Sequence, residues 1–295
     1  MQLQPKNEAE EILRELNEIS AEDGKNELLL QRYKHKANAL IRKADLFAGH
    51  ILLGAISAIE RDAEAMHHHH KLAISYGNGD PQGDMNYAVS LARFSLYPES
   101  VRYAEKAFQK DPFYLAALNT LIFSNLYMGR INEVPDLIRK QNKIGESHPL
   151  SEDVRKAVEI MERYEVTDKE TEQIFRIMSD LLAERKIYIR SADFSIMTDG
   201  DEERIHYNYD LDTEPELLPG IETELNIRWS ERVPPHVFDA VETDVTAPGA
   251  DSLYLSEDIS DVIMADGSLM EKINKARHEM REGVRYLSHK EVFGG

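Results

Sequence analysis

Four consecutive histidines, His67 to His70, are the first candidates for metal chemistry in this chain. A helix brings side chains three or four residues apart to one side, so only His67 and His70 can converge on one ion. Glu64 precedes His67 by three residues, and no further carboxylate at helical spacing completes a tetrahedral set of ligands. We therefore expect a polar helix face with one histidine packed inward. Nickel or zinc binding is the alternative.

Two acidic clusters suggest cations bound through oxygen. Asp210, Asp212 and Glu214 begin like a calcium-binding loop. That loop needs glycine at its sixth position and glutamate at its twelfth, where this chain has Pro215 and Ile221. The second cluster consists of Asp199, Asp201, Glu202 and Glu203. We expect both clusters to form a solvated acidic surface, with weak binding of divalent cations as the alternative.

No motif in the chain specifies a reaction. The G-x-S-x-G, H-E-x-x-H, P-loop and G-x-G-x-x-G patterns are all missing from the sequence. Arg285 and His289 resemble the arginine–histidine pair of HEPN-type ribonucleases, but fewer residues separate them than in that signature. An enzymatic alternative depends on His206, His236 and His289 meeting in space. We expect no catalytic residues, no cofactor and no functional metal.

The charge of the chain is unevenly distributed. The formal net charge is −19, and residues 191–270 contain 20 acidic residues against three arginines. Such a segment argues against direct binding of nucleic acid, since it repels phosphate. It favours a basic protein surface as a partner, or it keeps the protein soluble.

Other features of the composition indicate a soluble cytoplasmic protein. Cysteine is absent, which excludes disulfides and zinc–thiolate sites and suits a reducing compartment. The N-terminal residues are polar and acidic, without the apolar core of a secretory signal. The longest apolar run, residues 51–59, is far shorter than the ~20 residues of a membrane span.

The elements that must position these residues are mostly helices. Apolar residues recur at helical spacing over residues 7–20, 26–44, 46–60, 62–76, 151–164 and 168–186. Between them lie two helix pairs, residues 81–114 and 115–148. Glu99 and Glu133 begin matching helices 34 residues apart, and Glu64 precedes Glu99 by 35. A period near 34 made of two helices is typical of helical-repeat proteins.

The two helix pairs also carry family-specific residues. Ala107 with Asp111-Pro112 resembles the A-x-x-x-D-P ending of a tetratricopeptide (TPR) unit. Gly129 to Val134 resembles the central turn of such a unit, and Ala88 and Ser100 supply small residues for close packing. The resemblance covers residues 46–148 and extends at most to residue 188. Another α-solenoid or a generic helical bundle is the alternative.

The TPR resemblance implies a solenoid whose inner face holds a peptide segment of another protein. By this resemblance the partner-binding positions are Met85, Asn86, Val89, Arg93, Asn119, Thr120, Phe123 and Tyr127. Asparagine can hold a peptide backbone through two hydrogen bonds, and Phe123 and Tyr127 can anchor an apolar side chain. Packing against a neighbouring repeat is the alternative, above all for Val89 and Phe123. Asp84 and Leu118 depart from the family, which has a large aromatic residue there.

After residue 186 the pattern changes to strands. Residues 187–209 predict a β-hairpin and residues 222–229 a third strand, followed by a short helix at 237–241. Residues 253–255 predict a short strand and residues 268–288 a closing basic helix. The expected fold is α+β and multidomain, with an N-terminal α-solenoid of TPR-like helix pairs followed by a small acidic α+β domain. Its parts are N-terminal helices (1–45), TPR-like repeats (46–186) and the acidic domain (187–295).

Two functions follow from this organisation. The leading hypothesis is a cytoplasmic adaptor or chaperone-like protein that binds another protein on its repeat and does not contact membranes. The alternative is an acidic inhibitor or immunity-type protein, whose carboxylates mimic a polyanion in the basic site of a nucleic-acid enzyme. The sequence leaves the partner and the oligomeric state open.

Overall fold

The computed structural model describes residues 8–18, 26–144, 147–199 and 202–248. The chain divides into two compact units. The first comprises residues 1–125 with 136–148, and the second comprises residues 126–135 with 149–295. Within the described ranges, no helix combines the length and apolar character needed to cross a membrane.

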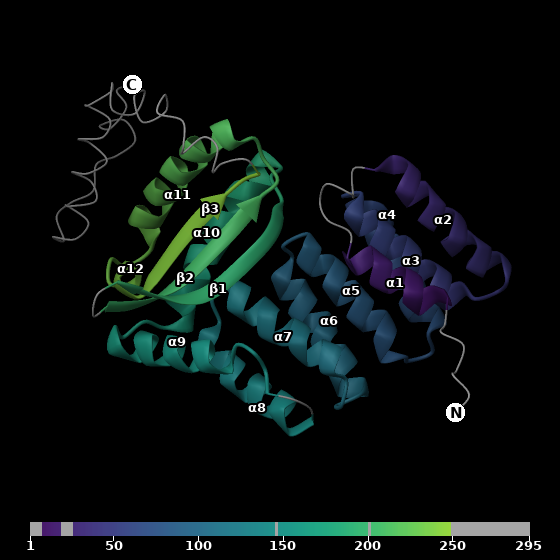
Figure 1. Ribbon diagram of the computed structural model, residues 1–295, viewed down its shortest axis with the longest axis horizontal. Coiled ribbons are helices and arrows are strands. Elements are labelled where there is room, and N and C mark those ends of the chain that lie inside the picture. The colour runs from purple at the N-terminus through teal and green to yellow at the C-terminus, as the bar shows by residue number, and fades with distance from the viewer. Residues whose placement is uncertain (1–7, 19–25, 145–146, 200–201, 249–295) are drawn as a thin grey trace. The chain divides into compact units, whose positions relative to one another are not determined.

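The first unit is built from helices (Figure 1). Their bounds are α1 Glu8–Glu18, α2 Glu27–Arg42, α3 Leu46–Ile59, α4 Ala63–Tyr76, α5 Pro81–Arg93, α6 Tyr97–Lys110, α7 Leu115–Tyr127 and α8 Val134–Ile144. The last two residues of α7 and the first two of α8 belong to the second unit. The helices predicted at 7–20, 26–44, 46–60 and 62–76 are confirmed to within two residues.

The four connections between α2 and α6 each contain a left-handed residue, and three of them close with the same hydrogen bond. Left-handed residues recur at a constant spacing, at Ala44, Arg61, Asn78 and Ser95. After three of these helices, an N–H closes the turn on the carbonyl five residues back: Asp45 to Leu40, Asp62 to Ser57 and Leu96 to Leu91. Asp45 and Asp62 then accept hydrogen bonds from the next helix, at 3.1 and 3.0 Å. One helix and its turn thus take half of the sequence period, and a helix pair takes the whole of it.

Helix α3 lies at the centre of the first unit and packs against α1, α2, α4 and α5. None of its 14 residues is exposed. Leu52 and Ile56 are completely buried, and they form one core with Ile12 and Leu16 of α1 and Leu30 of α2. A helix that is apolar on nearly all sides must be covered on all sides.

Small side chains and pairs of polar side chains fill the contacts among α5, α6 and α7. Ala88 and Ser100 are completely buried, and the Ser100 hydroxyl lies 3.2 Å from that of Ser124. Asp84 is buried and forms an ion pair with Lys110. The pairing satisfies a carboxylate that would be costly to bury alone.

The second unit contains a three-stranded mixed sheet in the order β1-β2-β3 (Figure 1). The strands β1 Ile189–Asp199 and β2 Glu202–Leu211 pair antiparallel, and β3 Val241–Thr246 pairs parallel to β2. Its helices are α9 Ser151–Arg163, α10 Asp168–Arg185, α11 Leu218–Arg232 and α12 Val237–Ala240, with short 3-10 helices at Ile131–Glu133 and Pro215–Leu217.

Aromatic residues on one face of the sheet form the core of the second unit. Tyr207 and Tyr209 alternate with half-buried neighbours along β2 and are completely buried. The ring of Phe175 in α10 lies 4.7 Å from that of Tyr207, and the Tyr207 hydroxyl donates to the Leu126 carbonyl at 3.0 Å. Trp229 of α11 donates its indole N–H to the carbonyl of Ile174, 3.1 Å away.

The structure confirms the predicted hairpin at 187–209 and the short helix at 237–241. The strand predicted at 222–229 is wrong, because these residues lie within α11. Leu225, Ile227 and Trp229 alternate like a strand, but Ile221, Leu225 and Trp229 share a buried helix face at spacings of four. The third strand is instead β3.

At the level of fold class, a helical region precedes a small mixed sheet with helices, as expected. The strand predicted at 253–255 and the helix predicted at 268–288 lie outside the described residues. The domain boundaries at residues 45 and 186 stay predictions.

Replacing Gly129 by alanine is expected to destabilise the second unit by about 2 kcal/mol or more. Gly129 has a φ of +77°, and an added Cβ would lie 2.6 Å from the ring of Phe175 and 2.7 Å from the backbone of Thr171. Gly220→Ala is the control, since nothing lies within 4 Å of its added Cβ. Urea unfolding of both variants tests this; equal stability of the two would contradict it.

Candidate functional site

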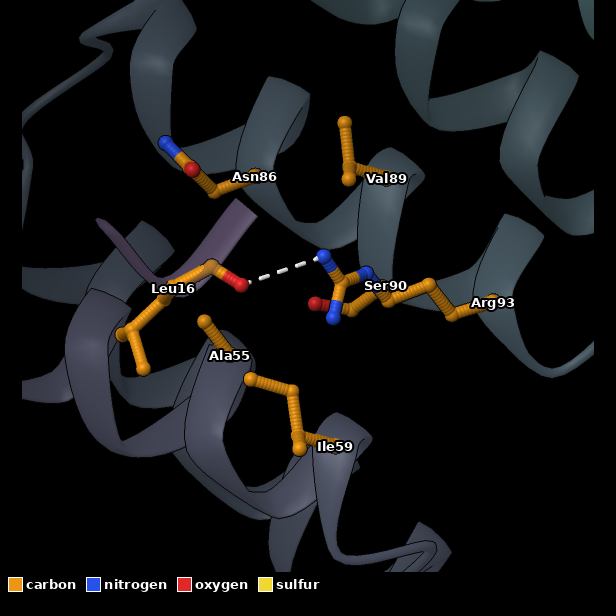
Figure 2. Close-up of a pocket in the computed structure, with 7 residues that line it drawn as sticks. All are labelled: Leu16, Ala55, Ile59, Asn86, Val89, Ser90 and Arg93. Carbon is orange, nitrogen blue, oxygen red and sulfur yellow. Dashed lines mark hydrogen bonds between the residues drawn. The ribbon is translucent and has the colours of Figure 1, made fainter. Parts of the chain in front are cut away.

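Three of the four partner-binding positions predicted on α5, Asn86, Val89 and Arg93, line a small cavity in the first unit. Asn86, Val89, Ser90 and Arg93 form one side of it, and Ala55 and Ile59 of α3 face them, together with Leu16 of α1 (Figure 2). The amide of Asn86 donates to the carbonyl of Gln82 within its own helix, at 2.8 Å.

These positions recur from helix to helix with the period of the sequence repeat. Leu52, Asn86 and Thr120 occupy one equivalent position of α3, α5 and α7. Two further series are Ala55, Val89 and Phe123, and Ile59, Arg93 and Tyr127. We call the eight of these residues that belong to the first unit the inner positions; Tyr127 belongs to the second unit. They are apolar on α3 and mixed on α5 and α7.

Helix α1 covers part of the inner positions. Leu16 is completely buried, and its carbonyl accepts a hydrogen bond from Nη2 of Arg93 at 3.3 Å (Figure 2). Arg61 in turn donates to the carbonyl of Arg93. Burial, together with the charge of Arg61, lowers the pKa of Arg93. The guanidinium of Arg93 thus joins the end of α1 to α5.

The positions predicted on α7 differ in exposure. Asn119 and Thr120 are half-buried, and the side chain of Phe123 is 36% exposed. The ring of Phe123 lies 5.8 Å from that of His148. These three residues leave polar and aromatic groups at the surface of the first unit.

Two of the predicted binding residues already contact other parts of the chain, one through packing and one through a hydrogen bond. Met85 is buried and packs with Ala107 and Ala117 in the core of the first unit. The hydroxyl of Tyr127 donates to the carbonyl of Ala192 within the second unit, at 2.6 Å. Burial raises the pKa of Tyr127 to about 12. The predicted binding role of these residues stays a prediction.

Three of the four histidines of α4 form hydrogen-bond contacts with different side chains. The ring of His70 is completely buried, and its Nε2 lies 2.8 Å from the hydroxyl of Ser90. His67 contacts the hydroxyl of Tyr87 at 2.6 Å, and Nδ1 of His69 lies 3.1 Å from Nδ1 of His50. Among the described residues, no group of three or more histidine, aspartate or glutamate side chains is placed to hold a metal ion.

Burial lowers the pKa of His67, His69 and His70 and so favours their neutral forms. It lowers the pKa of His70 to about 3 and, with the neighbouring His50, lowers that of His69 to about 4. Desolvation also lowers the pKa of His50 and His67. The Tyr87 ring stacks on His70 at 5.1 Å, so the histidine run is part of the packing of the first unit.

In the second unit, many of the predicted acidic residues are paired with bases. Glu203 lies 3.2 Å from Lys156 and 3.9 Å from Arg163. Asp210 pairs with Arg190 at 3.4 Å, and Glu202 pairs with Arg204 at 2.9 Å. Among the others, Glu214 is exposed and Asp212 is half-buried. The side chain of Asp199 and residue Asp201 lie outside the described part of the chain. These pairs neutralise part of the acidic surface.

Pairing of the strands places a serine and an aspartate, which sequence reasoning missed, beside His206, one of the three histidines of the enzymatic alternative. Nε2 of His206 lies 3.0 Å from Asp244, and Nδ1 lies 3.5 Å from the hydroxyl of Ser195. The serine contact is long and Ser195 is exposed, so the geometry is that of a polar sheet face rather than of an activated nucleophile. His236 is separate and faces Glu170 at 3.5 Å. His289 is not among the described residues.

Comparisons with models of protein families, with curated proteins and with solved structures found no match for this chain.

Acid is expected to destabilise the first unit through His70. In the unfolded chain the pKa of the His70 ring has its ordinary value of about 6.5. In the folded chain the pKa of this ring is about 3. The stability gained from the neutral ring is complete above pH 6.5 and is lost as the pH falls from there towards 3. His70→Gln should reduce the slope of unfolding free energy against pH by about 1.4 kcal/mol per unit between pH 6 and 4.

Urea unfolding at a series of pH values measures this slope. His35→Gln is the matched control, because His35 is exposed on α2. An unchanged slope in His70→Gln, relative to this control, would show that the buried ring does not set the acid sensitivity.

Proposed function

We propose that this chain is a protein–protein interaction adaptor, chaperone-like in that it holds a segment of another protein on a TPR-like helical repeat. The observation that carries the proposal is the recurrence of the inner positions on α3, α5 and α7 with the period of the sequence repeat. Repeats of this kind present equivalent side chains side by side, which makes an extended binding surface.

The chemistry of α7 supports a peptide ligand. Asn119 has an amide that can donate to and accept from a peptide backbone. Phe123, four residues further along the same helix, exposes an aromatic ring of the kind that anchors apolar side chains in interfaces. Thr120 adds a hydroxyl between them. A backbone held by Asn119 and a side chain packed on Phe123 would fix both the position and the register of a bound segment.

The alternative is an acidic inhibitor that mimics a polyanion. Exposed Asp193 and Asp244, on the polar face of the sheet, favour it. The ion pairs of Glu203, Asp210 and Glu202 weigh against it, because they cancel charge that a mimic of phosphate would present. The two functions differ in their dependence on salt, which screens exposed charges.

Substituting the α7 surface is expected to abolish capture of the partner. The full chain serves as bait in a lysate of its source organism, alongside the double variant Asn119→Ala/Phe123→Ser. We expect recovery of the partner to fall at least tenfold in this variant and to survive about 1 M salt, where the Debye length is about 3 Å. Leu28→Ser, which changes an 83%-exposed leucine of α2, is the control.

Equal recovery by the double variant and the control would contradict the adaptor proposal. A partner lost in high salt from every bait, and lost with Asp193→Asn/Asp244→Asn, would favour the acidic inhibitor.

A further inference from the structure

Helix α1 covers the α3 and α5 part of the repeat surface on which the adaptor proposal depends. The cavity between α1, α3 and α5 is lined on the repeat side by five inner positions and Ser90, and on the other side by Leu16 (Figure 2). The five inner positions are Ala55, Ile59, Asn86, Val89 and Arg93. The same surface is thus already covered by a segment of the chain itself.

The contact of α1 resembles that of a bound amphipathic helix. Ile12 and Leu16, four residues apart, are 2% and 0% exposed, while Glu10, Glu11 and Arg14 on the other side face solvent. Ile12 and Leu16 therefore act as the i and i+4 anchors of a helix in a groove. Between them, Glu15 accepts a hydrogen bond from the hydroxyl of Tyr33 at 3.0 Å.

The end of α1 adds a polar contact. Arg93 donates to the carbonyl of Leu16, which lies in the last turn of the helix, where carbonyls lack partners within the helix. A cation at this end also complements the helix dipole. Because the acceptor is a backbone carbonyl, this contact depends on where the helix ends and not on the side chains of the helix.

The chemistry of α3 favours a helical ligand over an extended one. Leu52, Ala55 and Ile59 offer no hydrogen-bonding side chain at the inner positions. An extended backbone laid on them would bury unpaired N–H and C=O groups, whereas a helix satisfies its own. The asparagine and threonine side chains of the repeat lie further along, on α5 and α7.

We infer that α1 is an intramolecular occupant of a helix-binding surface on α3 and α5, and that a partner binds there by displacing it with an amphipathic helix of the same pattern. This inference rests on the adaptor function proposed above. The required pattern is two apolar residues four apart, a glutamate before the second, and a helix end close behind it.

Displacement is favoured by the shortness of α1. It has 11 residues, and helices of this length are marginal in water without packing. Residues 19–26 connect it to the first residue of α2, so release of α1 leaves the rest of the chain covalently intact. A longer partner helix with the same anchors would compete for the same side chains.

A labelled peptide with the sequence of residues 8–18 tests the inference without an identified partner. The full-length variant Leu16→Asp should release α1 and bind this peptide at least tenfold more tightly than the native chain does. Leu28→Asp, at an exposed leucine, should bind no better than the native chain. The peptide carrying Leu16→Asp should not bind either chain, and Glu15→Gln in the peptide should weaken its binding. Absence of peptide binding to a folded Leu16→Asp chain would overturn the inference.

A second variant of the full chain tests the inference if Leu16→Asp does not fold. A protease site placed within residues 19–25 of the full chain leaves α1 held by its contacts alone after cleavage. Native mass spectrometry then follows α1. Exchange of the cleaved α1 for labelled peptide, with the remainder folded, supports the inference. Retention without exchange, or loss of the fold on release, overturns it. Because no partner is used, this result is independent of the pull-down on α7.

Discussion

The first unit depends on the burial of α3, whose side chains are apolar on almost every side. Such a helix cannot face water, so α2, α4, α5 and α1 must each cover part of it. The short left-handed turns at Ala44 and Arg61 fold α2 and α4 directly back against it. Helix α1 closes the remaining side, which coincides with the inner positions. The arrangement of the unit and the coverage of its candidate binding surface therefore have one cause.

The polar groups inside this unit follow from the same close packing. Gly54 of α3 leaves room for the ring of His70, since a Cβ at Gly54 would lie 2.7 Å from it. The ring is consequently completely buried, which lowers its pKa, and it is hydrogen-bonded to Ser90 and stacked on Tyr87. Within the run of four histidines, His70 and His67 contact α5, and His69 contacts His50 of α3. In the second unit, paired strands similarly convert scattered polar residues into a local network around His206.

Periodicity predicted most of the helical part of the chain, because its apolar residues recur regularly. The left-handed turn residues were not predicted, since Ala44, Arg61 and Ser95 are not glycines and adopt positive φ only because the turn closes around them. The third strand was misplaced because Leu225, Ile227 and Trp229 alternate within a helix. Parallel pairing of β3 with β2 joins segments far apart in the chain, and it produces no recognisable pattern in the sequence of either segment.

The candidate site was predictable only in part. The repeat period extends the positions predicted on α5 and α7 to Leu52, Ala55 and Ile59. The contact between Arg93 and Leu16 joins residues 77 apart and cannot be read from periodicity. The burial of Met85 and the hydrogen bond of Tyr127 likewise depend on tertiary packing.

The central claim is that α1 is a detachable cover on a stable α3, and native-state hydrogen exchange of the full chain tests it most directly. Amides of residues 12–16 should exchange through a local opening, with protection at least tenfold below that of residues 52–59 and little sensitivity to low denaturant. Residues 52–59 should exchange only with global unfolding of the first unit. Equal protection of the two segments, with the same dependence on denaturant, would show that α1 and α3 open together and would contradict the account.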